Sequence, residues 1–196
     1  MRKDPPVDQD YMNCLHLLNI ASLDGANIIN NPNAIKIFNE KEADELLVLD
    51  IDATVEGNRP NYDLIANFAV ECRMPLCYGG GIRTAEDALR LIDLGVEKVA
   101  ISAAAISNPD LVTQIAAITG RQSVVAAIDI RKRRGLFAKG YEVVSHNSKK
   151  VHKLDPIILA KNLQDAGAGE IVINCIDNDG VMQGYNLPLI EDIRKK

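Results

Sequence analysis

The sequence predicts an α/β fold in which a parallel sheet is wound into a barrel and covered by helices. Three observations support this fold class. From residue 33 onward, short apolar runs alternate with helical patterns. The runs are apolar almost without interruption, which is typical of strands buried on both faces. Polar residues or glycines follow these runs, so they gather at one rim if the sheet is a barrel.

Each element follows from its local pattern. Apolar runs predict five strands, at residues 45–51, 75–78, 98–101, 123–130 and 170–174. Helical patterns predict helices at residues 33–42, 61–72, 84–94, 108–119, 155–166 and 187–194. Thr84 with Asp87 fits a capping box, and Asp155 stands before a proline at a first helical position. These residues therefore mark two of the helix starts.

A doubly wound sheet and a barrel both fit this order of elements. The residues that follow the strands separate the two, and they are Asp50, the Gly79–Gly81 run, Ser102, Asp129 and Asp177. An open sheet concentrates its site at one switch point. Five consecutive strands that deliver polar groups to one rim instead predict a barrel mouth.

Length bounds the completeness of this barrel. The chain has 196 residues, whereas a complete (β/α)8 barrel typically has about 250. We expect one incomplete TIM-barrel domain over residues 1–196, with strands 2 to 6 clear and strands 7 and 8 missing. Residues 1–30 form an atypical N-terminal segment in which CLHLLNI is a candidate for the first strand.

Composition excludes several classes of protein. No apolar run reaches the roughly 20 residues of a membrane span, and the first residues lack a signal peptide, so we expect a cytoplasmic protein without membrane contact. The net charge of −5 argues against general nucleic-acid binding. The four cysteines lack the paired spacing of zinc or redox sites, and three histidines are few for a metal site. We expect no metal and no cofactor.

The charge is unevenly spread along the chain. Residues 131–153 hold eight Lys or Arg and one acid, a local charge of +7, while the remainder holds 14 basic and 26 acidic residues, a charge of −12. Alternation around YEVV predicts a hairpin over the mouth. Two interpretations stay open for this segment, namely solvated surface charge and an anion-attracting lid.

Two features of the rim fit an anion. Gly80 and Gly81 lie between a strand and the helix that begins at Thr84, where bare backbone N–H groups and a helix N-terminus favour phosphate. Ser102 ends the next strand and offers a hydroxyl to the same phosphate. A plain tight turn and a helix-capping serine are the structural alternatives.

Asp129 is the sharpest candidate for catalysis. It ends the apolar run VVAAIDI, where desolvation raises the pKa of a carboxyl group and suits it to general acid or base chemistry. A helix or loop cap is the alternative. Asp50 ends the run LLVLDI in the same way.

The loop after the last strand looks at first like half of a calcium loop. Asp177 and Asp179 precede Gly180 there. The twelfth position counted from the first aspartate is Pro188, where a calcium loop needs a glutamate. We therefore reject a calcium-binding loop.

A second group of charges precedes the strands. Glu45, Lys98 and Glu170 each stand before an apolar run, and the three runs are alternate strands. Residues from alternate strands of a barrel share one layer. These charges therefore form a ring across the barrel bottom, either as a salt-bridged plug or as a gate for a small molecule.

Five ordered stretches carry a family resemblance: ADELLVLDI, PLCYGGGIRTAEDALRLIDLGVEKVAIS, VVAAIDI, GAGEIVINCIDNDG and QGY. From about residue 32 onward they resemble the cyclase subunit of imidazole glycerol phosphate synthase. The resemblance implies a (β/α)8 barrel that receives ammonia from a glutaminase subunit docked at the barrel bottom. It also implies a reaction that joins this ammonia to a phosphorylated ribulosyl aminoimidazole-carboxamide nucleotide.

The resemblance implies a role for each matching residue. Asp129 corresponds to one of two catalytic aspartates of the family. The positions that match substrate or phosphate contacts are Asp50, Gly80, Gly81, Ser102, Asp179 and Gly180. Glu45, Lys98 and Glu170 correspond to three of the four residues of the ammonia gate.

The chain also departs from the family pattern. The other catalytic aspartate, which ends the first strand in the family, has no secure counterpart, and the gate arginine is unassigned. Ala103, Val181 and Asn186 replace a threonine, a threonine and an aspartate. The wording of CYGGGI, LGVEKVAIS and INCID is closer to cyclase paralogues of surface-polysaccharide gene sets, which supply ammonia for sugar amidation. An inactive truncated barrel is the remaining alternative.

Overall fold

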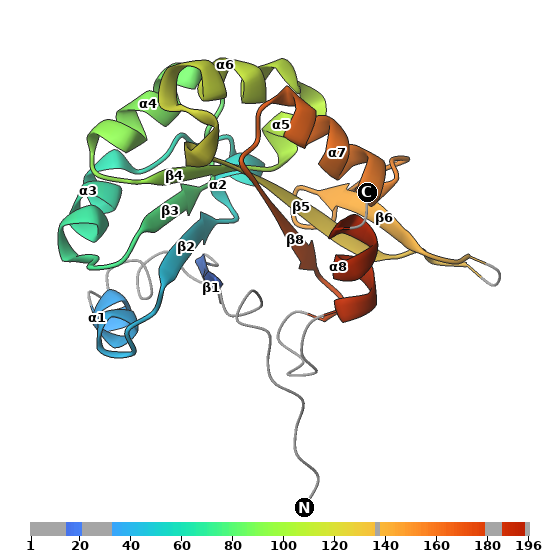
Figure 1. Ribbon diagram of the computed structural model, residues 1–196, viewed down its shortest axis with the longest axis horizontal. Coiled ribbons are helices and arrows are strands. Elements are labelled where there is room, and N and C mark those ends of the chain that lie inside the picture. Colours follow the sequence, from blue (N-terminus) through green and yellow to red (C-terminus); the bar gives the residue numbers. More distant parts are fainter. Residues whose placement is uncertain (1–14, 21–32, 136–137, 179–185, 195–196) are drawn as a thin grey trace, which may run out of the picture.

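The computed structural model describes residues 15–20, 33–135, 138–178 and 186–194 (Figure 1). The strands are β1 Leu15–Ile20, β2 Glu45–Asp50, β3 Leu76–Gly79, β4 Lys98–Ile101, β5 Val124–Lys132, β6 Tyr141–Ser145, β7 Lys150–His152 and β8 Glu170–Cys175. The helices are α1 Asn33–Glu40, α2 Ala53–Glu56, α3 Tyr62–Glu71, α4 Ala85–Asp93, α5 Ala103–Ser107, α6 Asp110–Thr119, α7 Pro156–Ala166 and α8 Leu187–Arg194.

The order of the strands identifies the sheet as barrel-like. Strands β1, β2, β3, β4, β5 and β8 pair in parallel and follow one another in chain order. A doubly wound sheet reverses its strand order at a switch point, and no reversal occurs among these six strands. Helices α3, α4, α6 and α7 lie along the outer face of the curved sheet (Figure 1). The expected incomplete TIM barrel is confirmed.

Neighbouring residues of each strand belong to different apolar clusters. Leu46 and Val48 of β2 pack in the large cluster that includes the helices, whereas Leu47 between them packs in a small cluster with Cys77, Ala100 and Val125. The strand sequences are continuously apolar because both faces of the sheet are buried. The small cluster marks the inside of the barrel.

Helix starts match the expected caps. The Thr84 hydroxyl accepts the Asp87 N–H at 3.2 Å, and the Asp87 carboxylate accepts the Thr84 N–H at 3.2 Å, which completes the capping box of α4. The Asp155 carboxylate caps α7 by accepting the N–H groups of Ile157 and Ile158. Two short helices, α2 and α5, were not expected from the sequence, because a single turn of helix is too short to show a period.

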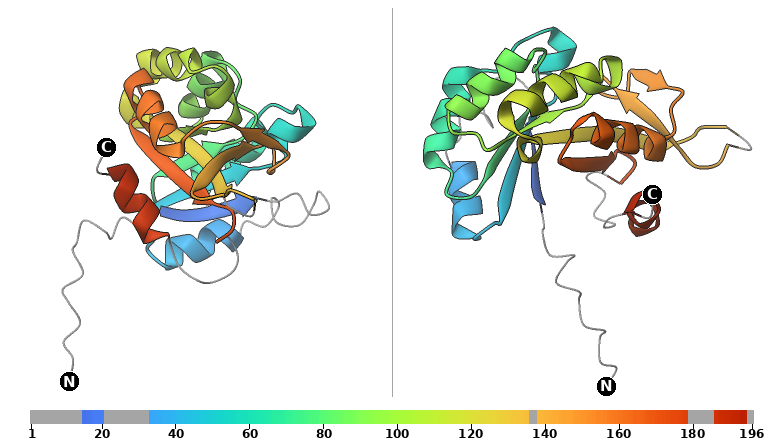
Figure 2. Two further views of the ribbon diagram at one scale, coloured as in Figure 1. Left: turned by 90° about the vertical axis from the view of Figure 1, so that its right-hand side faces the viewer. Right: turned by 45° about the horizontal axis from the view of Figure 1, so that its top comes forward.

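The first strand and the hairpin are both present. β1 lies within the candidate stretch CLHLLNI and pairs in parallel with β2, Leu15 opposite Glu45 and Ile20 opposite Asp50. The basic segment forms the expected hairpin, in which β6 pairs antiparallel with the extended end of β5 and with β7. Figure 2 shows this extension leaving the main body at the end of β5.

The two ends of the parallel series are not joined. Within the part of the chain that the structure describes, β1 pairs with β2 alone and β8 with β5 alone, so the barrel stays open between them. No described helix is long and apolar enough to cross a membrane.

Candidate functional site

A pocket lies at the carboxyl ends of the parallel strands. Its wall comes from the ends of β2 to β5 and β8, from the loops after β2 to β4, and from the turn of the β6–β7 hairpin. The polar residues and glycines that line it are Asp50, Thr54, Gly79, Gly80, Gly81, Ser102, Asp129, His146, Asn147 and Asn174. The mouth expected from the sequence therefore exists, and Asp50, Gly80, Gly81, Ser102 and Asp129 meet in it.

Asp129 is held in the pocket wall by its neighbour on β8. The side-chain amide of Asn174 donates to Asp129 Oδ1 at 2.9 Å, and the two residues are register partners. Asp129 follows Val125 and Ala127 at intervals of two, which places it on the inner face of β5. An amide donor stabilises the ionised carboxylate and fixes its orientation.

Asp50 has a structural bond as well as a place in the pocket. Its Oδ1 accepts the N–H of Ala53 at 3.0 Å and so supports the start of α2. The capping alternative considered for these strand-end aspartates therefore applies to Asp50. The bond fixes one carboxylate oxygen, and Asp50 still contributes to the pocket lining.

The glycine run packs directly on the backbone around Asp50. A Cβ atom at Gly80 would overlap the carbonyl oxygen of Asp50, and the φ angle of Gly80 is +129°. A Cβ at Gly81 would lie 2.7 Å from the carbonyl oxygen of Asn58, and its φ is +69°. Only glycine fits both positions, because L side chains avoid these φ values and the space is already filled.

The helix ends around the glycine run differ in their available donors. At α4, the N–H groups of Arg83 and Thr84 both donate to Asp87, so these two donors just before the helix are already engaged. At α5, Ser102 occupies the N-cap position without a capping side-chain bond. The Ser102 side chain therefore does not cap α5, although the residue has the N-cap position, and Ser102 lines the pocket.

The turn of the β6–β7 hairpin contacts the loop after β2 at the mouth. The side-chain amide of Asn147 donates to Asp52 Oδ1 at 3.1 Å, which joins the hairpin to the loop after β2. Next to it, the Ser145 hydroxyl lies 2.8 Å from His146 Nδ1 and 2.8 Å from His152 Nε2. Burial and the nearby Lys150 lower the pKa of His152.

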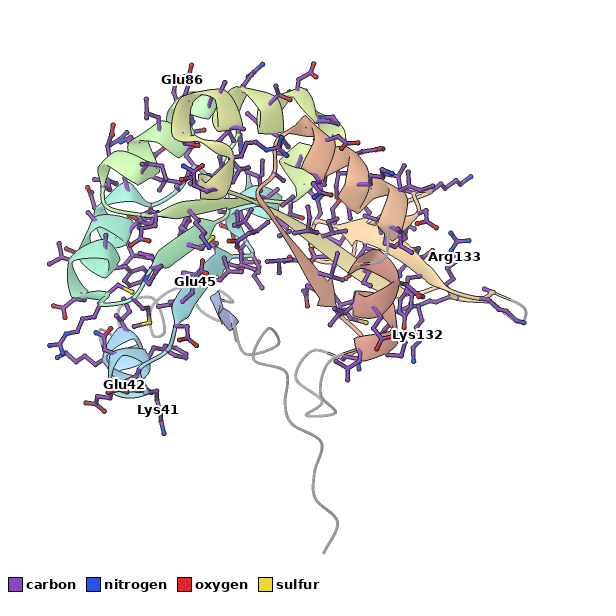
Figure 3. All side chains as sticks on the ribbon, in the orientation of Figure 1. Lys41, Glu42, Glu45, Glu86, Lys132 and Arg133 are labelled. Atoms are coloured by element: carbon purple, nitrogen blue, oxygen red, sulfur yellow. The ribbon has the colours of Figure 1, made fainter. Side chains whose placement is uncertain are left out.

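A charged ring lies at the opposite end of the strands. Lys98 Nζ contacts Glu45 Oε2 at 3.0 Å and Glu170 Oε1 at 2.5 Å. The three residues come from β4, β2 and β8, so the expected meeting of alternate strands is seen. In Figure 3, Glu45 lies in the left part of the curved sheet, whereas Lys132 and Arg133 lie in the right part, beside the hairpin.

The ring holds one unsatisfied atom. Glu45 Oε1 is buried and has no hydrogen-bond partner in the described part of the chain. Burial acts to lower the pKa of Lys98, but the hydrogen bonds and charges of Glu170 and Glu45 outweigh burial and raise it. Cys77 lies just inside the ring, and burial raises the pKa of its thiol well above the usual value.

Some expected residues fall elsewhere. Asp179 and Gly180 lie outside the described residues. Asp177 is exposed and does not line the pocket, and its Oδ2 accepts the backbone N–H of Lys132 at 2.6 Å. No group of three or more His, Cys, Asp or Glu in the described ranges could hold a metal ion.

Sequence reasoning missed four polar residues of the pocket. These are Thr54, His146, Asn147 and Asn174. Asn174 could have been found, because it follows Glu170 at an interval of four and so lies on the same inner face of β8. The other three come from irregular segments whose course the strand pattern does not fix.

The fold and the two rims define a parallel α/β-barrel protein with a polar pocket at one end and a charged ring at the other. The family model described as "Histidine biosynthesis protein" matches residues 22–196, and the chain belongs to this family. A second model, the N-terminal domain of prokaryotic glutathione synthetase, matches residues 1–36. That match is too short a share of the chain to show membership of a second family.

Named relatives agree with the family. The chain is 52% identical over 162 residues to a Vibrio vulnificus protein named provisionally as imidazole glycerol phosphate synthase subunit hisF3, covering 83% of this chain and 62% of that protein. It is 51% identical to a Leptospira interrogans protein with the provisional name of subunit HisF, covering 83% and 63%. It is 36% identical to imidazole glycerol phosphate synthase subunit HisF of Streptomyces coelicolor, covering 93% and 74%. The chain thus spans less than two thirds of the first two relatives.

Proposed function

We propose that this chain is a cyclase subunit of the imidazole glycerol phosphate synthase type. In this function, ammonia enters through the charged ring and joins a phosphorylated ribulosyl aminoimidazole-carboxamide nucleotide in the pocket. The product is imidazole glycerol phosphate, an intermediate of histidine biosynthesis. The names of the relatives support the proposal.

One observation carries this proposal: the same strands build the ring and the pocket. Glu45 and Leu49 belong to one inner-face row of β2, Lys98 and Ser102 to a row that runs along β4, and Glu170 and Asn174 to a row of β8. The small cluster of Leu47, Cys77, Ala100 and Val125 fills the space between the two ends. On this proposal, ammonia crosses the apolar layer along these three inner-face rows, which end beside Asp129 in the pocket.

Asp129 is proposed as a catalytic acid or base. It lines the pocket, and the Asn174 amide orients its carboxylate at 2.9 Å. Ring closure requires protons to be removed from and given to the substrate, and a positioned carboxylate serves both purposes. Asp50 lies across the pocket as a second carboxylate, with one oxygen fixed by Ala53.

The phosphate of the substrate is proposed to bind at the glycine run and Ser102. Gly80 and Gly81 expose backbone without side chains, and the Ser102 hydroxyl is not used as a cap. Backbone N–H groups in such a turn form an anion-binding concavity. Asp179 and Gly180 are proposed to complete the substrate site from the loop after β8.

Glu45, Lys98 and Glu170 are proposed as the ammonia gate, with a glutaminase subunit docked over them. The buried Glu45 Oε1, which lacks a partner among the described residues, supports a fourth, cationic member of the ring. A gate of this kind opens when Lys98 leaves one of its two carboxylate partners.

Turnover with ammonium tests the catalytic part of the proposal. The folded chain, mixed with the phosphorylated nucleotide and ammonium chloride at pH 8.5, is expected to form imidazole glycerol phosphate. Asp129→Asn is expected to lower kcat at least 100-fold. Asp177→Asn is the matched control, because Asp177 is a rim aspartate outside the pocket. No rate above background from the folded chain contradicts the proposal.

The wording of CYGGGI, LGVEKVAIS and INCID supports a second candidate, a paralogue that passes ammonia to an amidating enzyme of surface-polysaccharide synthesis. This candidate predicts that the chain raises the activity of a glutaminase partner but gives no cyclase turnover. The expected effect of Lys98→Met is then a change in ammonia leakage alone.

A further inference from the structure

A buried serine of the hairpin links two imidazole rings. Ser145, at the end of β6, is 1% exposed. Its Oγ lies 2.8 Å from Nδ1 of His146 in the turn and 2.8 Å from Nε2 of His152 on β7. The function proposed above assigns these three residues no role.

The Ser145 hydroxyl couples the imidazole rings of His146 and His152, because it has one proton to donate. A hydroxyl donates one proton, and a neutral imidazole has one N–H and one bare nitrogen. If His146 Nδ1–H donates to Ser145, then Ser145 donates to bare Nε2 of His152. The reverse order places the proton of His146 on Nε2. The three groups therefore change hydrogen-bond direction together, and the state of His152 sets the tautomer of His146.

The turn places His146 in the pocket wall. His146 and Asn147 line the pocket together with Asp129. The hairpin is fixed to the strand of Asp129 by the pairing of Val144 with Asp129, and it is fixed across the mouth by the bond from Asn147 to Asp52. With Nδ1 engaged by Ser145, the ring has Nε2 to offer to a ligand.

The backbone of the turn adopts an unfavourable conformation at three consecutive residues. His146, Asn147 and Ser148 have φ angles of 55°, 53° and 65°. Residues other than glycine seldom adopt this left-handed region, because it is sterically unfavourable for an L side chain. Three consecutive residues in this region form a compact turn that brings the imidazole to the rim.

We propose, on the basis of the proposed function, that His146 is the second proton-transferring group of the pocket, acting with Asp129. In this proposal Ser145 and His152 are positioning residues that form a proton relay behind it. Ring closure needs both an acid and a base, and Asp50, the other carboxylate that lines the pocket, has one oxygen engaged by the Ala53 N–H. The imidazole at the rim supplies a group that can both take up and release a proton near neutral pH.

For each proton that enters the relay from the substrate, one proton leaves it to solvent. Nε2 of neutral His146 takes a proton from the substrate, and its Nδ1 proton passes to Ser145 Oγ. The hydroxyl proton of Ser145 moves to bare Nε2 of His152, which carries the positive charge and releases it to solvent from Nδ1. Burial and Lys150 lower the pKa of His152, which favours its neutral form and the release of the proton to solvent. The other charged groups around the turn are Lys149 in the turn itself, Asp129 and Asp50 in the pocket, and Asp52 across the mouth.

Nitrogen-15 NMR of the histidine rings tests the relay without substrate. The chain has three histidines, so His16→Gln completes the assignment. In the wild type we expect His146 in one dominant tautomer and a titration in which protonation of His152 shifts His146. In Ser145→Ala we expect mixed tautomers and two independent titrations. Identical tautomer ratios and titration curves in both proteins would overturn the relay.

Turnover measurements test the catalytic role. His146→Asn suits the left-handed turn, because asparagine tolerates positive φ. It is expected to lower kcat about 100-fold with KM within threefold. Ser145→Ala is expected to shift one limb of the kcat pH profile. Lys161→Gln, on the exposed surface of α7, is the control.

The outcomes separate this inference from the proposed function. A wild type that turns over together with a His146→Asn variant of equal kcat overturns the role of His146 alone. A folded wild type without cyclase turnover contradicts both the proposed function and the catalytic role. The NMR titrations decide on the relay in either case.

Discussion

The two ends of the barrel are built in opposite ways. At the bottom, three residues that begin β2, β4 and β8 meet in one ion cluster around Lys98. At the mouth, the pocket takes residues from strand ends, from the loops after three strands and from a hairpin turn. The register of a parallel sheet alone places the bottom ring, whereas the mouth also depends on backbone of irregular course.

The difference also concerns what holds each end in place. The ring consists of side chains with a direct charge interaction, and its backbone is regular sheet. The mouth relies on backbone fit, such as Gly80 against Asp50, and on single hydrogen bonds such as Asn147 to Asp52. We therefore expect substitutions that change charge to destabilise the ring, and substitutions that add or remove side-chain volume to destabilise the mouth. The four predictions below test this contrast.

Gly80→Ala is expected to give the largest loss of stability. The new methyl overlaps the carbonyl oxygen of Asp50 and forces alanine into a φ of +129°. The cost is about 4 kcal/mol in the free energy of unfolding, measured with urea. Gly140→Ala is the matched control, because Gly140 has φ +82° but nothing within 4 Å of its Cβ. It is expected to cost about 1 kcal/mol, and equal losses would contradict a role for backbone fit.

Lys98→Met is expected to destabilise the bottom ring by about 2 kcal/mol, between the values of exposed and fully buried ion pairs. The substitution leaves Glu45 and Glu170 facing each other without a cation. Adding Glu45→Gln to Lys98→Met is expected to recover part of the loss, since it removes one of the two carboxylates. Urea unfolding measures both variants. Additive losses in the double variant would show that the ring charges do not interact.

The two ends are expected to lose stability at opposite pH. The raised pKa of Lys98 means that its contribution is present below 10.5 and is lost as the pH rises through the folded value. The lowered pKa of His152 means that the unfolded chain takes up a proton first, so stability falls as the pH drops below 6.5.

Unfolding curves from pH 4 to 11 check this contrast. In a plot of unfolding free energy against pH, Lys98→Met is expected to flatten the alkaline side. His152→Gln is expected to flatten the acid side. Burial and Asp87 raise the pKa of Tyr62 to about 12, so its contribution to the stability of the fold is also lost at alkaline pH. Differences from the wild type remove the contribution of Tyr62 and leave those of Lys98 and of Cys77, whose pKa Lys98 acts to lower. A Lys98→Met difference that is constant with pH would disagree with a charged ring.

Asn147→Ala is expected to have the smallest effect, about 0.5 kcal/mol, because its bond to Asp52 is exposed. Hydrogen exchange should nevertheless speed up in β6 and β7, which lose their anchor across the mouth. Asn58→Ala removes a similar exposed bond to Glu56 within one loop and is expected to leave the hairpin unchanged. Faster exchange in both variants would point to a general loosening.

The strand pattern predicted the parts of the site that depend on register. Glu45, Lys98 and Glu170 were expected to meet because alternate strands share a layer, and they do. Asp129 and the glycine run were placed at the mouth by their position at strand ends. Strand order and caps followed from local composition, because buried parallel strands and helix starts have strong sequence preferences.

The remainder depends on contacts between distant segments. The bond of Asp50 to Ala53 and the closed capping box of α4 change which donors face the pocket. The position of His146 follows from three positive φ angles in one turn. Backbone conformation of this kind has little signature in sequence when the residues are not glycine.

The apolar layer between the two ends has an electrical consequence. Leu47, Cys77, Ala100 and Val125 are at most 3% exposed and offer no charge or strong hydrogen bond. An ion that enters such a layer loses its hydration at a cost of several kcal/mol, whereas a small neutral molecule loses little. The layer therefore favours neutral molecules over ions on the inner face of the sheet, and it separates the charges of the ring from the carboxylates of the pocket.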